Sequence, residues 1–204
     1  IHDRVKNNLQ ILSSLVQMQS RRTQSSEAVL ALRDSRNRIE SIALVHEKLY
    51  CSENLASLDF AQYIPNLTAH LFDTYQVSSD LVHLNLEVEA IFLDLKMGIP
   101  CGLIITELVA NSLKHAFPNH RSGEIQVNFF AHRPGMITLM VRDNGVGFPD
   151  HFDLETNESL GLMLVYELVD QLEGTIELNQ SQFTEFKIIF PLNSMNFNSI
   201  KRLD

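Results

Sequence analysis

Hydrophobic positions in the first fifty residues recur at the spacing of amphipathic helices. Val5, Leu9 and Leu12 follow one another at four- and three-residue intervals, which places them on one helix face. The pattern predicts a helix from residue 5 to about residue 22, and the polar stretch 23–26 predicts a turn. The first proline is Pro65 and the first glycine is Gly98. Helices in this part of the chain can therefore run without interruption.

A second run of apolar residues at helical spacing follows the turn. Its members are Val29, Leu32, Ile39, Ile42, Ala43, Val45 and Leu49. The polar face of this helix carries Arg33, Asp34, Arg36, Arg38 and Glu40. Two helices joined by a short turn predict an antiparallel hairpin, which cannot bury both apolar stripes by itself. We expect the hairpin to pair with a second copy as a four-helix dimer; the alternative is packing against the C-terminal part of its own chain.

The rest of the chain mixes strand patterns with helical ones. Strands are predicted at residues 82–88, 125–130, 137–142, 175–178 and 185–190, and helices at 60–73, 99 or 100 to 116, and 160–172. We place Pro100 at the start of the middle helix, where its missing N–H costs least. The tail from Asn193 is predicted to be polar and loosely held. The predicted fold class is α+β, a helical hairpin followed by an α/β layer whose mostly antiparallel or mixed sheet is covered by helices on one face.

Composition narrows the class of protein. The 204 residues are 45% hydrophobic, enough for a packed core, yet no apolar run approaches the roughly 18 residues of a membrane span. Cys51 and Cys101 have neither a disulfide framework nor metal-ligand spacing, so we expect reduced thiols in a cytoplasmic protein. The chain begins at Ile1 without a signal-peptide pattern, and we expect a piece of a longer protein.

Charge is divided unevenly along the chain. Residues 1–50 hold eight basic and five acidic side chains, whereas residues 51–204 hold eight basic and twenty acidic ones. This asymmetry predicts two segments with different roles. The acidic body argues against a nucleic-acid partner, because phosphate backbones need clustered cations.

The helix predicted to end at residue 116 carries a group of polar side chains on one face, each about one turn or less from the next. Its members are Glu107, Asn111, Lys114 and His115. A carboxylate, a carboxamide and an ammonium on one helix face can hold a hydrated Mg²⁺ and phosphate oxygens. On these residues alone, a solvated polar stripe remains the alternative.

Two glycine-containing segments follow. Asp143, Gly145 and Gly147 come directly after a predicted strand, where the glycines permit a tight turn and the carboxylate could accept a hydrogen bond from adenine N6. The last helix opens with Ser159, Leu160, Gly161 and Leu162. A serine cap and exposed N–H groups at a helix start suit a phosphate. This is not a Walker sequence, because no Gly-Lys-Ser or Gly-Lys-Thr occurs.

In this order and spacing, the three segments resemble the N, G1 and G2 boxes of the histidine-kinase-like ATPase family, whose Bergerat fold is shared with Hsp90, MutL and gyrase B. The resemblance implies ATP and Mg²⁺, with Asn111 as the metal ligand and Glu107 ordering water around the metal. It implies an adenine contact at Asp143 and an ATP lid at residues 148–158. The remaining nucleotide-binding residues would be Lys114, His115, Gly145, Gly147, Ser159, Leu160, Gly161 and Leu162.

The start of the chain, Ile-His-Asp-Arg-Val-Lys-Asn-Asn-Leu-Gln, resembles the phosphoacceptor helix of bacterial sensor histidine kinases of the second HisKA type, relatives of the HWE kinases. Residues 38–50 resemble the second helix of that domain. In much of this subfamily a histidine stands where this chain has Asp3. A carboxylate beside a histidine can orient the imidazole and take its proton, so we assign His2 as the phosphoacceptor and Asp3 as its helper. A terminal His2 without a role is the alternative.

The resemblance spans about residues 1–191 and implies two domains, residues 1–75 for dimerisation and histidine phosphotransfer and residues 76–204 for ATP binding. It implies autophosphorylation on histidine, phosphotransfer to the aspartate of a response-regulator receiver domain, a homodimer through the N-terminal helices, and a sensor domain upstream of this piece. The alternatives are a non-catalytic dimerisation and docking module, an ATPase of the same superfamily with Glu107 activating water, and a serine kinase of the anti-sigma type. Neither the ATPase nor the serine kinase requires the helix that carries His2.

Overall fold

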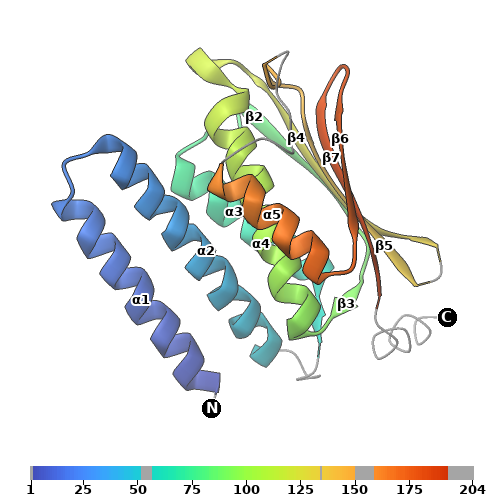
Figure 1. Ribbon diagram of the computed structural model, residues 1–204, viewed down its shortest axis with the longest axis horizontal. Helices are drawn as coiled ribbons and strands as arrows, with labels where there is room; N and C mark the ends of the chain where they lie inside the picture. The colour runs from blue at the N-terminus through green and yellow to red at the C-terminus, as the bar shows by residue number, and fades with distance from the viewer. Residues whose placement is uncertain (1, 52–56, 134, 150–158, 193–204) are drawn as a thin grey trace.

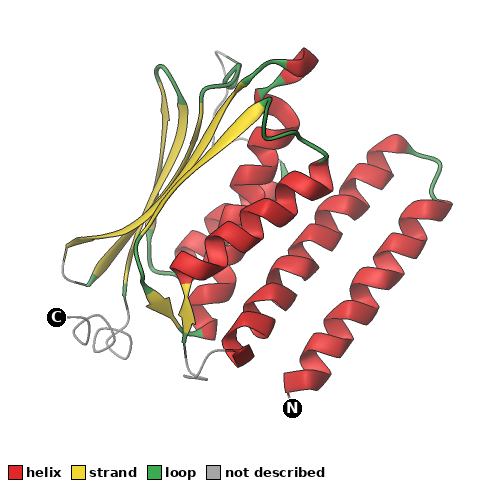
Figure 2. Ribbon diagram, turned by 180° about the vertical axis from the view of Figure 1, so that it is seen from behind, coloured by secondary structure: helices red, strands yellow, loops and turns green. Residues whose placement is uncertain are grey.

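The computed structural model describes residues 2–51, 57–133, 135–149 and 159–192. Its elements form successive layers (Figure 1). A sheet is covered on one face by helices α3 (Phe60–Tyr75), α4 (Leu95–Asn111) and α5 (Leu160–Gln171), and beyond them lie α2 (Ser26–Cys51) and then α1 (His2–Arg22). The view from behind shows the same order (Figure 2). The predicted lid after residue 149 and the tail from Asn193 lie outside the described residues.

The sheet has five strands in the order β2 (Val82–Val88), β4 (Gly123–Arg133), β5 (Met136–Asp143), β7 (Thr184–Pro191) and β6 (Thr175–Gln180). Strands β2 and β4 run parallel and every other neighbouring pair is antiparallel. The predicted mixed sheet with helices on one face is confirmed. Strands β1 (Leu58–Asp59) and β3 (Phe92–Leu93) form a separate small pair. The sequence did not predict this pair, because two residues are too few to show a period.

The core lies between the sheet and its helices. On β4, Ile125, Val127 and Phe129 alternate toward the helices and are fully buried. The Phe129 ring stacks on Phe60 at the start of α3, with 5.1 Å between ring centroids, and the caps of α3 include Asp59, whose carboxylate accepts the Ala61 N–H at 2.9 Å. The division after residue 75 stays a prediction, although α3 packs as part of the sheet's own core.

Helix α4 begins earlier than predicted. Asp94 caps it by accepting the Met97 N–H at 3.0 Å, and Leu95 is the first helical residue. Pro100 therefore lies inside the helix, and its placement at the start was wrong. The α-helical part ends at Asn111, and a π-helical turn, η1 (Ser112–Ala116), continues it before the 3₁₀ turn η2 (Pro118–His120). Such π-helical turns occur often at functional sites.

Helices α1 and α2 form the predicted antiparallel hairpin. Lys6 Nζ lies 3.3 Å from Glu47 Oε2 across it, and the Ser13 hydroxyl donates to Glu40 at 2.9 Å. The other side of α2 packs on α3 and α4, where Val45 is almost fully buried. The hairpin thus packs through α2 on the C-terminal part of its own chain, the arrangement that the sequence left open beside a four-helix dimer. Among the described residues, no helix combines the length and apolar character of a membrane crossing.

Candidate functional site

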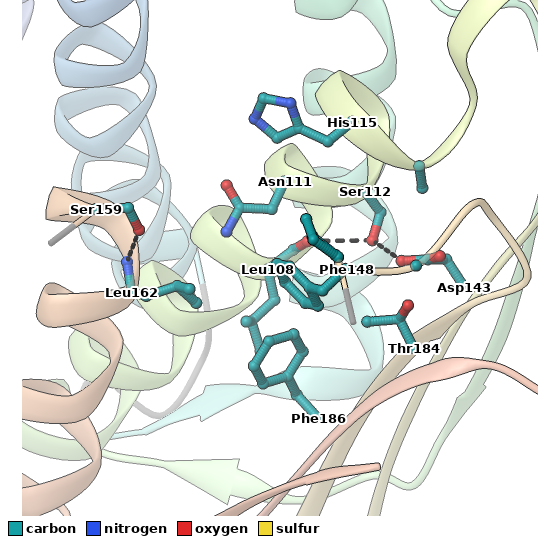
Figure 3. Close-up of a pocket in the computed structure, with 13 residues that line it drawn as sticks. Leu108, Asn111, Ser112, His115, Asp143, Phe148, Ser159, Leu162, Thr184 and Phe186 are labelled. Atoms are coloured by element: carbon teal, nitrogen blue, oxygen red, sulfur yellow. Dashed lines mark hydrogen bonds between the residues drawn. The ribbon is translucent and has the colours of Figure 1, made fainter. Parts of the chain in front are cut away.

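A cavity of about 370 Å³ opens between the end of α4, the end of β5 and the start of α5. Its lining is Leu108, Asn111, Ser112, His115, Ala116, Asp143, Gly147, Phe148, Pro149, Ser159, Leu162, Thr184 and Phe186. Figure 3 shows Asp143 and Ser159 at opposite sides, with Asn111 between them. The structure therefore brings together residues from all three sequence segments.

Asp143 forms the polar end of the cavity. It is the last residue of β5 and is only 5% exposed. Its Oδ1 accepts the Gly145 N–H at 3.0 Å, and its Oδ2 accepts the Ser112 hydroxyl at 2.7 Å. Burial raises the pKa of Asp143, and these two hydrogen bonds offset part of that rise. A carboxylate has about four lone-pair sites, so Asp143 can still accept a hydrogen bond from a ligand's amino group.

The Ser112 hydroxyl has one proton and two acceptors within reach. It lies 3.3 Å from the Leu108 carbonyl and 2.7 Å from Asp143 Oδ2 (Figure 3). The charged and nearer acceptor forms the stronger hydrogen bond. Ser112 thus fixes the carboxylate of Asp143 in the cavity wall.

The glycines of the second segment set the close approach of the loop to η1. A Cβ at position 145 would lie 2.4 Å from the Ala116 carbonyl oxygen, and the next residue, Val146, donates its N–H to that oxygen at 2.9 Å. Gly147 has a φ of +74°, a conformation that side chains rarely adopt. Beyond it, the Phe148 ring meets Phe186 edge-on at 6.1 Å. The apolar side of the cavity is therefore suited to a flat ring.

The other end of the cavity is formed by α5 and the polar residues of α4 and η1. Ser159 caps α5 by accepting the Leu162 N–H at 3.4 Å. His115 lines the cavity, and burial, aided by the charge of Lys114, lowers its pKa. Asn111 brings an amide oxygen to this end. Among the described residues, no group of three or more His, Cys, Asp or Glu side chains gathers as a metal site. A Mg²⁺ ion fits the oxygen chemistry here, because it binds through few protein ligands and substrate phosphates.

Five of the predicted nucleotide-site residues, Leu160 and four others, do not line the cavity. Glu107 is 5% exposed and both of its carboxylate oxygens accept from Arg38 of α2, at 2.6 Å from Nε and 3.0 Å from Nη2. Lys114 Nζ lies 3.0 Å from Oδ2 of Asp34, also on α2. Gly161 permits close contact with Glu107, since a Cβ there would lie 2.7 Å from Oε2. The fourth residue is Gly145.

Leu160 is 66% exposed and does not line the cavity, unlike its neighbours Ser159 and Leu162. His2 and Asp3 open α1, but their side chains lie outside what the structure describes. The functional roles assigned to all these residues remain predictions.

Several lining residues escaped the sequence reasoning. They are Leu108, Ser112, Ala116, Thr184 and Phe186. Leu108 and Ser112 could have been found, because they stand three residues before and one residue after Asn111. Thr184 could not, since it is brought to the site by its pairing with Asp143 between β5 and β7, 41 positions apart in sequence.

Known proteins resemble this chain in both of its parts. Residues 1–75 match a histidine kinase family of the second HisKA type, and residues 99–194 match the family of histidine kinase-, DNA gyrase B- and HSP90-like ATPases. The sensor histidine kinase PdtaS of Mycobacterium tuberculosis is 35% identical over 185 residues. PdtaS of Mycolicibacterium smegmatis is 34% identical over 181 residues.

These alignments cover 89% and 88% of this chain but 36% of each PdtaS, so the chain spans about a third of the length of those relatives. The histidine kinase domain of the Erythrobacter litoralis EL346 blue-light activated histidine kinase has the same fold, with a TM-score of 0.73 at 18% identity over 93% of this chain and 98% of that one. The match of residues 99–194 to an ATPase family supports the use of ATP. The chain therefore belongs to the histidine kinases, with the histidine kinase helices and the ATPase domain of that family in one polypeptide.

Proposed function

We propose that this chain is the transmitter core of a two-component system, which binds ATP with Mg²⁺, phosphorylates itself on His2 and passes the phosphoryl group to a response-regulator aspartate. The observation that carries the proposal is the cavity whose buried carboxylate, Asp143, is held by Ser112 and the Gly145 N–H. Such an acceptor beside Phe148 and Phe186 suits adenine, which has an amino donor and a flat apolar ring.

The phosphate end would lie toward Asn111 and the start of α5. Free N–H groups in the first turn of a helix favour anions, and Ser159 caps this one. Asn111 would ligate Mg²⁺ and Glu107 would order its water; the ion would neutralise charge on the phosphate oxygens. His115 has a lowered pKa and would act near the phosphates as a neutral hydrogen-bonding group.

In the transfer step, the unprotonated nitrogen of the His2 imidazole attacks the γ-phosphorus. The new N–P bond forms as the bond to the bridging oxygen breaks, and ADP leaves with that oxygen. The proton on the other imidazole nitrogen passes to the carboxylate of Asp3. The receiver aspartate then takes the phosphoryl group from nitrogen. We place the reaction in the cytoplasm, where ATP and the receiver are both available.

The test is the chemistry of the label. The purified 204-residue chain is incubated with Mg²⁺ and ATP labelled in the γ-phosphate, and we expect protein-bound label that acid removes and alkali does not, as for a phosphoimidazole. ATP labelled in the α-phosphate is the control and should leave no label. Label that resists acid would indicate a hydroxyl acceptor, and nucleotide binding without label would favour the non-catalytic module.

A second prediction concerns the partner of the hairpin. Helix α1 packs on α2 with one face, and its other face exposes Ile11, Leu12, Leu15 and Met18. We propose that a second copy covers this exposed apolar face. Leu15 is 51% exposed and lies in the middle of this face, so we expect its substitution to prevent dimerisation. The Leu15→Glu variant is expected to be a monomer by size-exclusion chromatography with light scattering, because it would bury a carboxylate without a partner.

Gln17→Glu is the matched control, since it adds the same charge on α1 at an exposed position away from the apolar face. This variant should remain a dimer. A wild-type chain that elutes as a monomer at every concentration would contradict the dimer.

A further inference from the structure

Helix α2 meets the ATPase domain through a face that is polar from Asp34 to Ser41 and apolar at Val45. Asn37, Ser41 and Val45 follow one another at four-residue intervals on this face and are at most 2% exposed. Asp34 extends it toward the hairpin turn, and Arg38 lies next to Asn37. The Oδ1 atom of Asn37 is buried without a hydrogen-bond partner. Polar, incompletely satisfied contacts between domains permit relative motion more readily than a large hydrophobic interface does.

Two ion pairs join this face to the predicted phosphate end of the site. Arg38 makes a two-pronged contact with Glu107, and the hydrogen bond to Glu107, opposed by burial, raises the pKa of Arg38. Asp34 lies 3.0 Å from Lys114. In both pairs the side chains are no more than 25% exposed. Each charged residue of this α2 face therefore lies opposite a residue of the other sign, Arg38 opposite Glu107 and Asp34 opposite Lys114.

Asp34 has a second partner across the interface, Tyr75 at the end of α3. The Tyr75 hydroxyl donates to Asp34 Oδ1 at 2.8 Å and accepts from Asn37 Nδ2 at 3.0 Å. The guanidinium of Arg33 stands over the Tyr75 ring, 4.5 Å from its centre. The contacts with Tyr75 therefore add to the Lys114 ion pair, and release of α2 has to break both.

These contacts conflict with the proposed binding of Mg²⁺ and ATP. Glu107 would have to bind the water around a divalent cation, yet both of its carboxylate oxygens already accept hydrogen bonds from the cationic Arg38. Lys114 would have to face phosphates, yet the anionic Asp34 neutralises it. Arg38 is cationic like the Mg²⁺ expected beside Glu107, and Asp34 is anionic like the phosphates expected beside Lys114. Like charges would therefore meet if α2 stayed docked while Mg²⁺ and ATP were bound.

The same docking keeps the acceptor away from the site. The Lys6–Glu47 ion pair sets the start of α1 beside residue 47, nine positions along α2 from Arg38. At about 1.5 Å per residue, and with His2 four positions before Lys6, the start of α1 lies roughly 20 Å along the helices from Arg38. Helix α2 also stands between α1 and the domain that holds the cavity (Figures 1 and 2).

We propose that the α2 face formed by Asp34 and Arg38 is an autoinhibitory latch that competes with Mg²⁺ and ATP for Glu107 and Lys114. Nucleotide binding releases the latch, and release frees the hairpin to bring His2 to the nucleotide. The proposal rests on the proposed function, because it takes Glu107 and Lys114 as part of the nucleotide site.

The test uses variants on α2 only, in the 204-residue chain. Asp34→Asn keeps the acceptor oxygen for Tyr75 but loses the charge opposite Lys114, and Arg38→Gln removes the charge opposite Glu107. Each is expected to bind Mg²⁺-ATP about 5- to 10-fold more tightly than the wild type by isothermal titration calorimetry, within the usual range of coupling between sites. The matched control is Arg36→Gln, since Arg36 pairs with Glu40 of its own helix. Its affinity should be unchanged.

Amide hydrogen exchange gives a second readout that needs no variant. Adding Mg²⁺-ATP to the wild-type chain is expected to speed exchange in residues 34–45, because the docked face is released. Unchanged affinity in both variants, or slower exchange in this segment, would reject the latch and leave the proposed function standing. Weaker binding by Arg38→Gln would instead make Arg38 a nucleotide contact and overturn the latch. Absence of binding in every form would overturn the nucleotide site and the latch together.

Discussion

The Asp143→Asn variant is expected to bind ATP about 10- to 100-fold more weakly than the wild type. A hydrogen bond to a charged group contributes roughly 1.5–3 kcal/mol, which corresponds to a loss of this size. The carboxylate can accept from Ser112, from the Gly145 N–H and from an adenine amino group at once. A carboxamide has one acceptor oxygen, and its NH₂ group would face other donors. Calorimetric titration with ATP measures the loss.

The matched control for this experiment is Asp170→Asn, which makes the same change at an exposed position of α5. It should leave ATP affinity unchanged. Wild-type affinity in Asp143→Asn would show that Asp143 does not contact the base.

The pH dependence of binding follows from the same residue. Burial raises the pKa of Asp143 above its usual value, so the carboxylate takes up a proton at a higher pH than an ordinary aspartate. The ionised carboxylate, which accepts the hydrogen bond from the adenine amino group, is present above this raised pKa. It is lost as the pH falls through that pKa, so ATP affinity should fall with it. Fold stability responds with the opposite sign, because burial penalises the charged form and acidification relieves that penalty. The Asp143→Asn variant should show neither effect of this group.

The Asn111→Ala variant is expected to lose Mg²⁺-dependent phosphorylation, by about 100-fold or more. Removing even an indirect support of a metal ligand commonly costs 10- to 100-fold, and Asn111 is the proposed ligand itself. The helical hairpin should stay folded by circular dichroism. Labelling from γ-labelled ATP at several Mg²⁺ concentrations measures the effect.

Asn66→Ala is the control for that variant, since Asn66 is exposed on α3 and its Nδ2 donates within the helix, to the Gln62 carbonyl. It should label like the wild type. Full labelling of Asn111→Ala would remove Asn111 from the metal site.

Local patterns predicted the elements whose period is long enough to show. The hairpin and the alternating strand β2 follow directly from residue spacing, and both are confirmed. The start of α4 was missed because Pro100 is a strong local signal, whereas the true start depends on one side-chain cap at Asp94. Intrinsic preferences are easily outweighed by such a cap together with the packing of α4 against the core.

The candidate site divides along the same line. Asn111 and His115 could be predicted together, because one helix carries both and short spacing decides their geometry. The Thr184 side of the cavity depends on the register of β5 against β7, which no local pattern gives. The partners of Glu107 were also beyond the sequence, since a charged helix face that binds another helix has the same pattern as one that faces solvent.

The most direct test of the account compares the wild-type chain with His2→Ala for label transferred from γ-labelled ATP. We expect label on the wild type, none on the variant, and equal ATP affinity in both, because the cavity lies in the other domain. A variant that binds ATP equally and still takes up acid-labile, alkali-stable label would contradict His2 as the phosphoacceptor.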